Sequence, residues 1–554
     1  MSTRTHKLYF QIYFWILVYI AISLPLSKYT MSMGSLMLFA LWLCKDFQGE
    51  VVTRFYRQKG FFTGSYLLVT YLYRLAAENI KEETKKFLDN KPAVIFSFIY
   101  IIHLVALLNT SNFSYGIKDL RIKLPLLFFP LVFAGMKKLT YAQFRKLLLF
   151  YLAAIFAGTL ISTYRLVNND YLDIREISPF ISSIRFGLNI TFGIFILLYF
   201  VFVDSFFTIK QKAGMLLMSA WFLIFLFYLE SITSLSILLI LGLGILFAQI
   251  LKIKSRPIKI AFVLILILIP SSVYVYVRQV VTQAGIVKNQ DVHPQKYSAQ
   301  GNPYTFDTIN HGVEDGKYVG WYLCEPELRK AWNSRSKFAY EGSDKKGGPL
   351  KETLIRYLTS KNLRKDSLGV SKLNHQDIYW IEHGVANVNY VMHPGLRTRI
   401  LKILKGYEVY RRTGNPSGSS IMQRIEYWKA ARSIIQQHLF FGVGTGDLED
   451  AFYGQFAKMH SQLKPKYMFH AHNQYLAIWV AFGLIGLVVF FMALLYPLFS
   501  NHAYRDYFVV VFYGIMLLSM LTDDTLETHA GVSLFAFFMG LMLFGKEREN
   551  ARAE

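Results

Sequence analysis

The chain has 554 residues, of which 53% are hydrophobic and 16% aromatic, and its formal net charge is +24. No nucleic-acid-binding motif accompanies this charge, so a charge bias across a membrane together with an anionic ligand explains it better. The two cysteines, Cys44 and Cys324, are predicted to lie on opposite sides of the membrane, which argues against a disulfide scaffold or a thiolate metal site.

Apolar runs recur along the whole chain, and each is long enough to cross a hydrocarbon core of about 30 Å as a helix. A dozen such runs in one chain argue against the buried helices of a soluble protein. We therefore predict an all-α polytopic membrane protein with about 12 transmembrane helices. The predicted spans are 8–26, 29–44, 92–109, 122–136, 146–164, 186–204, 215–230, 232–251, 260–277, 473–498, 507–522 and 529–545.

Charges in the short loops orient these spans. With the N-terminus inside, the inner loops 137–146 and 252–259 carry cations and no acid. Residues 45–91 then form a cytoplasmic amphipathic segment, which is either a basic helix on the membrane or a solvated connector. The predicted domains are a membrane bundle at 1–277 with spans 1–9, an outer loop domain at 278–472, spans 10–12 at 473–545, and a cytoplasmic tail at 546–554.

The outer loop has two parts with different signals. Its first part, to about residue 415, is rich in Gly, Pro, Asn and Tyr, and its role is not predicted. Between 278 and 470 the loop carries 28 Lys and Arg against 17 Asp and Glu, which serves either an anionic partner or solubility alone. Several aromatic residues either stack on sugar rings or simply pack: Tyr318, Trp321, Tyr322, Tyr379 and Trp380.

The second part of the loop carries the sharper pattern. A helix capped by Ser419 or Ser420 places Arg424, Trp428 and Arg432 on one side, at four-residue spacing. The glycine-rich turn at 442–446 lacks the Gly-Lys-Ser/Thr ending of a phosphate-binding loop, so it indicates close approach of backbone to backbone or ligand.

Two histidines, His470 and His472, stand at the mouth of the tenth span. They are either zinc ligands or hydrogen-bonded structural residues. Their spacing is i, i+2 and no carboxylate triad is evident nearby, so we expect no metal there.

These segments together resemble the signature of the O-antigen ligase and polymerase superfamily. That pattern has an Arg-x-x-Tyr-Trp helix, a Gly-Val-Gly-x-Gly turn, and His-x-His-Asn-x-Tyr-Leu entering a span with paired glycines. The chain has SIMQRIEYWKAA at 420–431, FGVGTG at 441–446, HAHNQYL at 470–476 and FGLIGL at 482–487, in the same order. One departure is that relatives often carry a Ser-Arg pair where this chain reads Ser-Ile-Thr-Ser from residue 231.

The resemblance implies a GT-C-like glycosyltransferase of lipopolysaccharide biosynthesis in the cell envelope. It would move a glycan from undecaprenyl pyrophosphate to a sugar hydroxyl of lipid A–core or another glycan acceptor, inverting the anomeric centre. The reaction would take place on the periplasmic face of the bacterial inner membrane, with no cofactor, no obligatory metal and no nucleic acid. A polymerase or protein O-oligosaccharyltransferase of the same superfamily is the alternative. A transporter of lipid-linked sugars and a non-catalytic scaffold are rivals of other classes.

Three residues are predicted to be catalytic. His472 matches the family position expected to act as general base. Arg424 matches the family helix, and Arg185, which opens the sixth span, matches a further family arginine; the pair would hold the diphosphate without a metal. Alternatively, Arg185 anchors the span at lipid headgroups. The predicted substrate-binding residues are His470, Asn473, Tyr475, Tyr427, Arg432 and Gly444.

Overall fold

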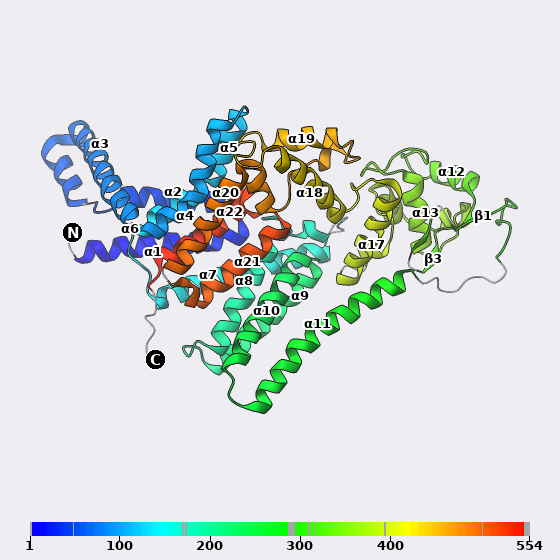
Figure 1. The fold of residues 1–554 in the computed structure, drawn as a ribbon, viewed down its shortest axis with the longest axis horizontal. Helices are drawn as coiled ribbons and strands as arrows, with labels where there is room; N and C mark the ends of the chain where they lie inside the picture. Colours follow the sequence, from blue (N-terminus) through cyan, green and yellow to red (C-terminus); the bar gives the residue numbers. More distant parts are fainter. Residues whose placement is uncertain are drawn as a thin grey trace.

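The computed structural model describes residues 3–47, 49–168, 171, 174–285, 294–308, 311–314, 316–392, 395–500 and 502–547, and most of the predicted tail lies outside these ranges. The chain forms a helical bundle that contains both described ends and a smaller loop domain beyond it, linked to the bundle by the long helix α11 (Figure 1). The α-helices of the bundle are α1 (Thr3–Leu26), α2 (Lys28–Leu43), α3 (Gly49–Asp89), α4 (Lys91–Val105), α5 (Phe113–Lys123), α6 (Pro125–Gly135), α7 (Tyr141–Asn168), α8 (Ser183–Phe202), α9 (Ile209–Tyr228), α10 (Ile232–Lys252), α11 (Arg256–Gly285), α20 (Gln474–Ser500), α21 (Tyr507–Thr522) and α22 (His529–Gly540).

Helices cover all twelve predicted spans. By length and composition, eight helical segments of the described chain are able to cross a membrane, and α21 and the helix at 529–545 are shorter apolar helices. The second and fourth predicted spans correspond to α2, with 16 residues, and α6, with 11 residues. The chain is thus a multi-pass α-helical membrane protein, and twelve crossings stay a prediction.

The helix at 529–545 lies at the centre of the bundle. Its residues from Ala530 onward are buried, and Ser533 is its one polar side chain in that stretch. A helix that is apolar all round is stable only when neighbours surround it, and α6 and α21 pack against it. By contrast, α11 leaves its apolar side chains exposed at the edge of the bundle, where lipid would cover them (Figure 1).

The amphipathic segment at 45–91 folds back on itself. The rings of Phe55 and Tyr71 are 6.1 Å apart, and the Tyr56 hydroxyl lies 3.3 Å from Ser65 Oγ. Sixteen residues of straight helix would span about 24 Å. The segment is therefore a helical hairpin that turns between Tyr56 and Ser65, and whether it lies on the membrane surface stays a prediction.

The loop domain has its own core and four short strands beside its helices, so the described chain is mostly helical, in line with the predicted fold class. Its helices are α12 (Glu325–Asn333), α13 (Leu350–Ser360), α14 (Ser367–Ser371), α15 (His375–Glu382), α16 (Asn389–Met392), α17 (Leu396–Thr413), α18 (Ser420–Gln437) and α19 (Leu448–Lys458). Strands β1 (Thr305–Asp307) and β4 (Gly320–Leu323) pair antiparallel with Phe306 opposite Trp321, and β2 (Val313–Glu314) pairs with β3 (Lys317–Tyr318).

The aromatic residues of this domain serve mainly in packing. Trp332, Tyr340, Tyr357 and Trp380 are buried in one hydrophobic cluster. Tyr318 stacks on Trp321 with 5.2 Å between ring centroids.

Helix α17 fastens the loop domain to the bundle at the position where the family pattern is broken. The carboxylate of Glu230, just before Ser231, accepts a hydrogen bond from Gly395 N at 3.1 Å and pairs with Lys402 Nζ at 3.3 Å. Glu230 is buried, so this ion pair is shielded from solvent. The turn that lacks the family arginine thus anchors a basic helix instead.

Candidate active site

His472 stands directly before α20, in a backbone conformation that is rare for a residue with a side chain. Its φ is 45°, in the left-handed region. The next residue fixes the start of the helix: Asn473 Oδ1 accepts a hydrogen bond from Leu476 N at 3.1 Å, and Asn473 Nδ2 donates to Leu521 O at 2.9 Å. This backbone turn aims the imidazole at the segment between α21 and α22.

Two aspartates of that segment hold both histidines. His472 Nδ1 lies 3.3 Å from Asp523 Oδ1 and 3.1 Å from Asp524 Oδ1. His470 Nδ1 lies 2.6 Å from Asp524 Oδ2. We call residues 523–528 the acidic turn; it includes η5 (Thr525–Glu527). The two histidines, two positions apart, therefore share one pair of carboxylates.

Arg185 reaches the same turn from the first turn of α8. Its Nη1 lies 2.5 Å from Asp523 Oδ2, its Nε donates to Thr528 Oγ1 at 3.1 Å, and its Nη2 donates to the carbonyl of Asp524 at 3.1 Å. The residue is only 3% exposed. The guanidinium that was predicted to bind a diphosphate thus binds the acidic turn. Arg185 contacts Asp523, which in turn contacts His472.

These contacts set the protonation of the site. Burial would lower the pKa of His472, but hydrogen bonds and charges from Asp523 and Asp524 outweigh burial and raise it to about 9. The pKa of His470 is likewise raised, since Asp524 outweighs its burial. Burial would raise the pKa of Asp524, but the two histidines hold it well below its usual range. At neutral pH a mostly protonated His472 therefore lies beside an ionised Asp524.

Helix α18 covers His472 from the side of the loop domain. The ring of Tyr427 lies 5.5 Å from that of His472, and Trp428 Nε1 donates to Ala471 O at 3.0 Å. Burial raises the pKa of Tyr427, and the charge of Arg424 partly opposes this. Arg424 is half-buried one turn before Tyr427, whereas Arg432 is exposed farther along the helix.

Several predicted substrate-binding residues have their polar atoms bonded within the protein. The hydroxyl of Tyr427 donates to Tyr467 O at 2.6 Å, and that of Tyr475 donates to Leu517 O at 2.9 Å. Asn473 bonds the ends of two helices, as described above. These polar groups are therefore already used in hydrogen bonds within the protein.

The glycine-rich turn packs against backbone. Gly444 N donates to Ala481 O at 2.9 Å, and a Cβ on Gly444 would lie 2.3 Å from the carbonyl oxygen of Asn109. Its φ of 98° also favours glycine. Of the two uses predicted for this turn, the structure shows the close approach of backbone to backbone, and binding of a substrate by Gly444 stays a prediction.

The two aspartates were missed in the sequence. Asp523 and Asp524 are adjacent acids at the end of an apolar helix, in a stretch with few other charges. A charge at the mouth of a membrane helix suggests a functional site by default, and that signal was available. Nothing local, however, connects them with His472, about fifty residues earlier.

Among the described residues, the cluster of His472, Asp523 and Asp524 could hold a metal ion by its geometry. Ligand atoms of His472, Asp523 and Asp524 all lie within 4.8 Å of one another, so folding supplies the carboxylates that the sequence did not reveal. A cation would require deprotonated histidines and would compete with Arg185 for Asp523. The donor set therefore fits a charge-paired proton-transfer site better than a metal centre.

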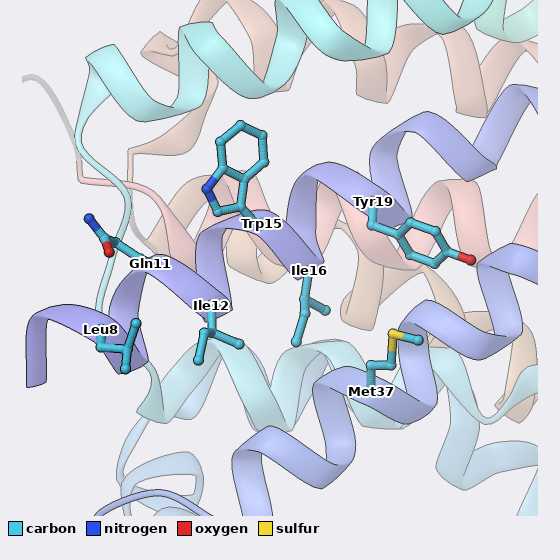
Figure 2. A pocket seen from close by; sticks show the side chains of 7 residues that line it. All are labelled: Leu8, Gln11, Ile12, Trp15, Ile16, Tyr19 and Met37. Carbon is cyan, nitrogen blue, oxygen red and sulfur yellow. The ribbon is translucent and has the colours of Figure 1, made fainter. Parts of the chain in front are cut away.

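An open groove of about 500 Å³ lies elsewhere, on the surface of α1 and α2 (Figure 2). Gln11 is its one polar side chain apart from the hydroxyl of Tyr19, and Trp15 and Met37 are among its apolar ones. It offers no acid, base or cation for group transfer, and its composition suits a lipid chain.

Comparison with known proteins agrees with the motifs. Residues 379–491 match the family model Wzy_C, described as O-Antigen ligase. The match includes His470, His472 and all of α18, and confirms the resemblance to the superfamily. Arg185 and the acidic turn lie outside the matched range. No curated protein matches the chain.

Proposed function

We propose, from the O-antigen ligase domain that residues 379–491 carry, that this multi-pass membrane protein is a glycosyltransferase. It transfers a glycan from undecaprenyl pyrophosphate to a sugar hydroxyl of lipid A–core, at the periplasmic face of the bacterial inner membrane. The observation that carries this proposal is the arrangement of His472 on Asp523 and Asp524 at one end of the bundle.

His472 acts as the general base. Its Nδ1 faces the carboxylates, which leaves Nε2, on the other edge of the ring, for the acceptor hydroxyl. The hydroxyl gives its proton to Nε2 while its oxygen bonds to the anomeric carbon of the donor. The bond from that carbon to the diphosphate oxygen breaks, and the electron pair leaves with undecaprenyl pyrophosphate. Asp523 and Asp524 stabilise the imidazolium that forms, as the acid does in a Ser-His-Asp triad.

A pKa of about 9 makes His472 a strong base that is mostly protonated at neutral pH. About 1% of the imidazole is neutral at pH 7. The protonated form is also useful, because it attracts the anionic donor before the acceptor arrives. Neutral His472 is then the reactive form, and its fraction controls the rate.

We assign the contact with the donor diphosphate to Arg424. It matches the arginine of the family helix and lies beside Tyr427, whose ring contacts His472. A guanidinium can hold a diphosphate in bidentate fashion and stabilise the charge of the leaving group. Arg185 is instead a positioning residue, since its three donor nitrogens bind the acidic turn.

Replacing His472 or Arg424 by Ala tests the proposal. Transfer from a lipid-linked glycan to lipid A–core is measured with purified protein, and each variant should lose about 100-fold or more in rate. Lys458→Ala, which removes an exposed cation from helix α19, is the matched control and should keep wild-type activity. If both site variants fold and transfer normally, the mechanism is wrong. A chelator arm accompanies the assay, and loss of activity on chelation would assign the cluster to a cation.

The product distinguishes the related functions. In a deletion strain, accumulation of free lipid-linked polymer indicates a ligase, and shortened polymer indicates a polymerase. Loss of protein glycosylation indicates a protein O-oligosaccharyltransferase. A transporter would form no covalent product in the purified assay.

A further inference from the structure

A group of buried charges lies on the side of the acidic turn that faces α5. Lys123 is 1% exposed, and its Nζ lies 2.5 Å from both Asp119 Oδ1 and Glu527 Oε2. His103, on α4, places its Nδ1 3.1 Å from Asp119 Oδ2. Neither the motifs nor the proposed reaction uses these groups.

This group is connected to the base through Gln474. Gln474 Nε2 donates to Glu527 Oε1 at 2.8 Å, and Gln474 Oε1 accepts a hydrogen bond from Leu526 N at 2.7 Å. Gln474 is fully buried and follows His472 by two residues. The acidic turn is therefore held from two sides, by Arg185 from α8 and by Lys123 from α5.

We expect these buried ion pairs to affect the position of the acidic turn more than the free energy of unfolding of the protein. Apolar side chains of similar volume often replace a buried ion pair at no loss of stability, because desolvation offsets the attraction between the charges. Breaking such a pair by removing one partner, however, leaves a buried charge without compensation. Loss of Lys123 would leave the carboxylates of Asp119 and Glu527 facing each other. Glu527 belongs to the acidic turn, which is a short loop, so we expect this turn to shift in response.

We infer that Lys123 is a positioning residue for the reaction: through Glu527 and Gln474 it fixes the acidic turn, and thereby Asp523 and Asp524, beneath His472. The catalytic part of this inference rests on the proposed function. Its structural part, the anchoring of the acidic turn, does not.

The test measures both parts in Lys123→Met, a change of similar side-chain volume. Hydrogen exchange of the backbone amides at 523–528, followed by mass spectrometry, should become clearly faster, with Leu526 the most direct reporter. The transfer rate at saturating donor and acceptor should fall roughly 10- to 100-fold, because a small displacement of the base costs that much. The donor KM should stay within about twofold, since Arg424 is untouched.

A second variant and a matched control separate positioning from general destabilisation. Lys123→Met with Glu527→Gln removes one of the two uncompensated carboxylates, leaves Asp119 beside His103, and keeps an amide able to bond Gln474, so both readouts should partly recover. The control is Asp204→Asn, which breaks the buried pair in which Arg145 Nη1 lies 3.3 Å from Asp204 Oδ2. It should lower thermal stability without changing exchange at the acidic turn or the transfer rate of folded protein.

Two outcomes overturn the inference: unchanged exchange at 523–528 in Lys123→Met, or faster exchange with an unchanged transfer rate. If the wild-type protein transfers no glycan while exchange still rises in Lys123→Met, the proposed function fails and the anchoring of the turn stands. The two failures are thus distinguishable.

Discussion

His472 adopts a left-handed backbone conformation that costs roughly 1–2 kcal/mol for a residue with a side chain. Its contacts with Asp523 and Asp524 offset this cost, and both acids are buried. Strain of this kind is common where a site must aim one side chain. The same contacts raise the pKa of His472, so the aim of the ring and its basicity have one cause.

The pH dependence of transfer follows from this pKa. Only neutral imidazole accepts the proton, so the rate should rise about tenfold per pH unit between pH 6 and 8 and level off near pH 9. Asp524→Asn removes one of the contacts that raise the pKa, so the rise should move to lower pH and the maximum rate should fall. Initial rates across this pH range provide the measurement. Glu449→Gln, at an exposed acid of α19, is the control, and a rate independent of pH would argue against His472 as the base.

At the scale of elements, two motif segments form one structural unit. Helix α20 is interrupted at Gly483, whose φ is 65° and ψ −169°. The segment around the glycine-rich turn bonds the backbone at this break: Leu484 N donates to Leu439 O at 2.8 Å, and Val443 N donates to Val480 O at 3.0 Å. A break in an apolar helix needs such partners, because no water is present to supply them. This explains physically why both segments are rich in glycine.

Gly483→Ala should disrupt this unit. A Cβ at that position would lie 2.1 Å from the backbone carbon of Phe440, and the positive φ adds strain. We expect a destabilisation of more than about 2 kcal/mol, seen as a lower melting temperature in detergent. Gly454→Ala is the control: a Cβ there meets nothing within 4 Å, and alanine favours helix α19. Equal melting temperatures for the two variants would contradict this account.

At the scale of the whole molecule, segments that are predicted to lie on the same side of the membrane contact one another in the structure. Arg185, His472 and the acidic turn, all predicted to lie outside, are bonded to one another. Segments predicted to lie inside also meet: Leu139 N donates to Gly545 O at 2.7 Å, and Lys546 Nζ lies 2.5 Å from Asp506 Oδ2. The side of the membrane that each end faces stays a prediction.

Labelling of single cysteines tests that orientation. In a chain with Cys44 and Cys324 replaced by Ser, Arg432→Cys should react with a membrane-impermeant maleimide in intact spheroplasts. Lys210→Cys should react only after the membrane is permeabilised, because the positive-inside bias places its loop in the cytoplasm. Both positions are exposed, so the difference reports on sidedness. The reverse labelling pattern would invert the topology and move the acidic turn to the cytoplasm.

The sequence by itself determined the helical membrane architecture, the positions of the helices, the motif helix α18 and the position of His472 directly before α20. These features depend on local properties: the length of apolar runs, the spacing of residues along a helix, and short motifs. Only the tertiary structure decided that Arg185 binds Asp523, that Lys123 supports the acidic turn, that Gly444 packs against backbone, and that α3 folds back. The residues of the first two contacts are hundreds of positions apart, and packing between helices brings them together, which no local pattern encodes.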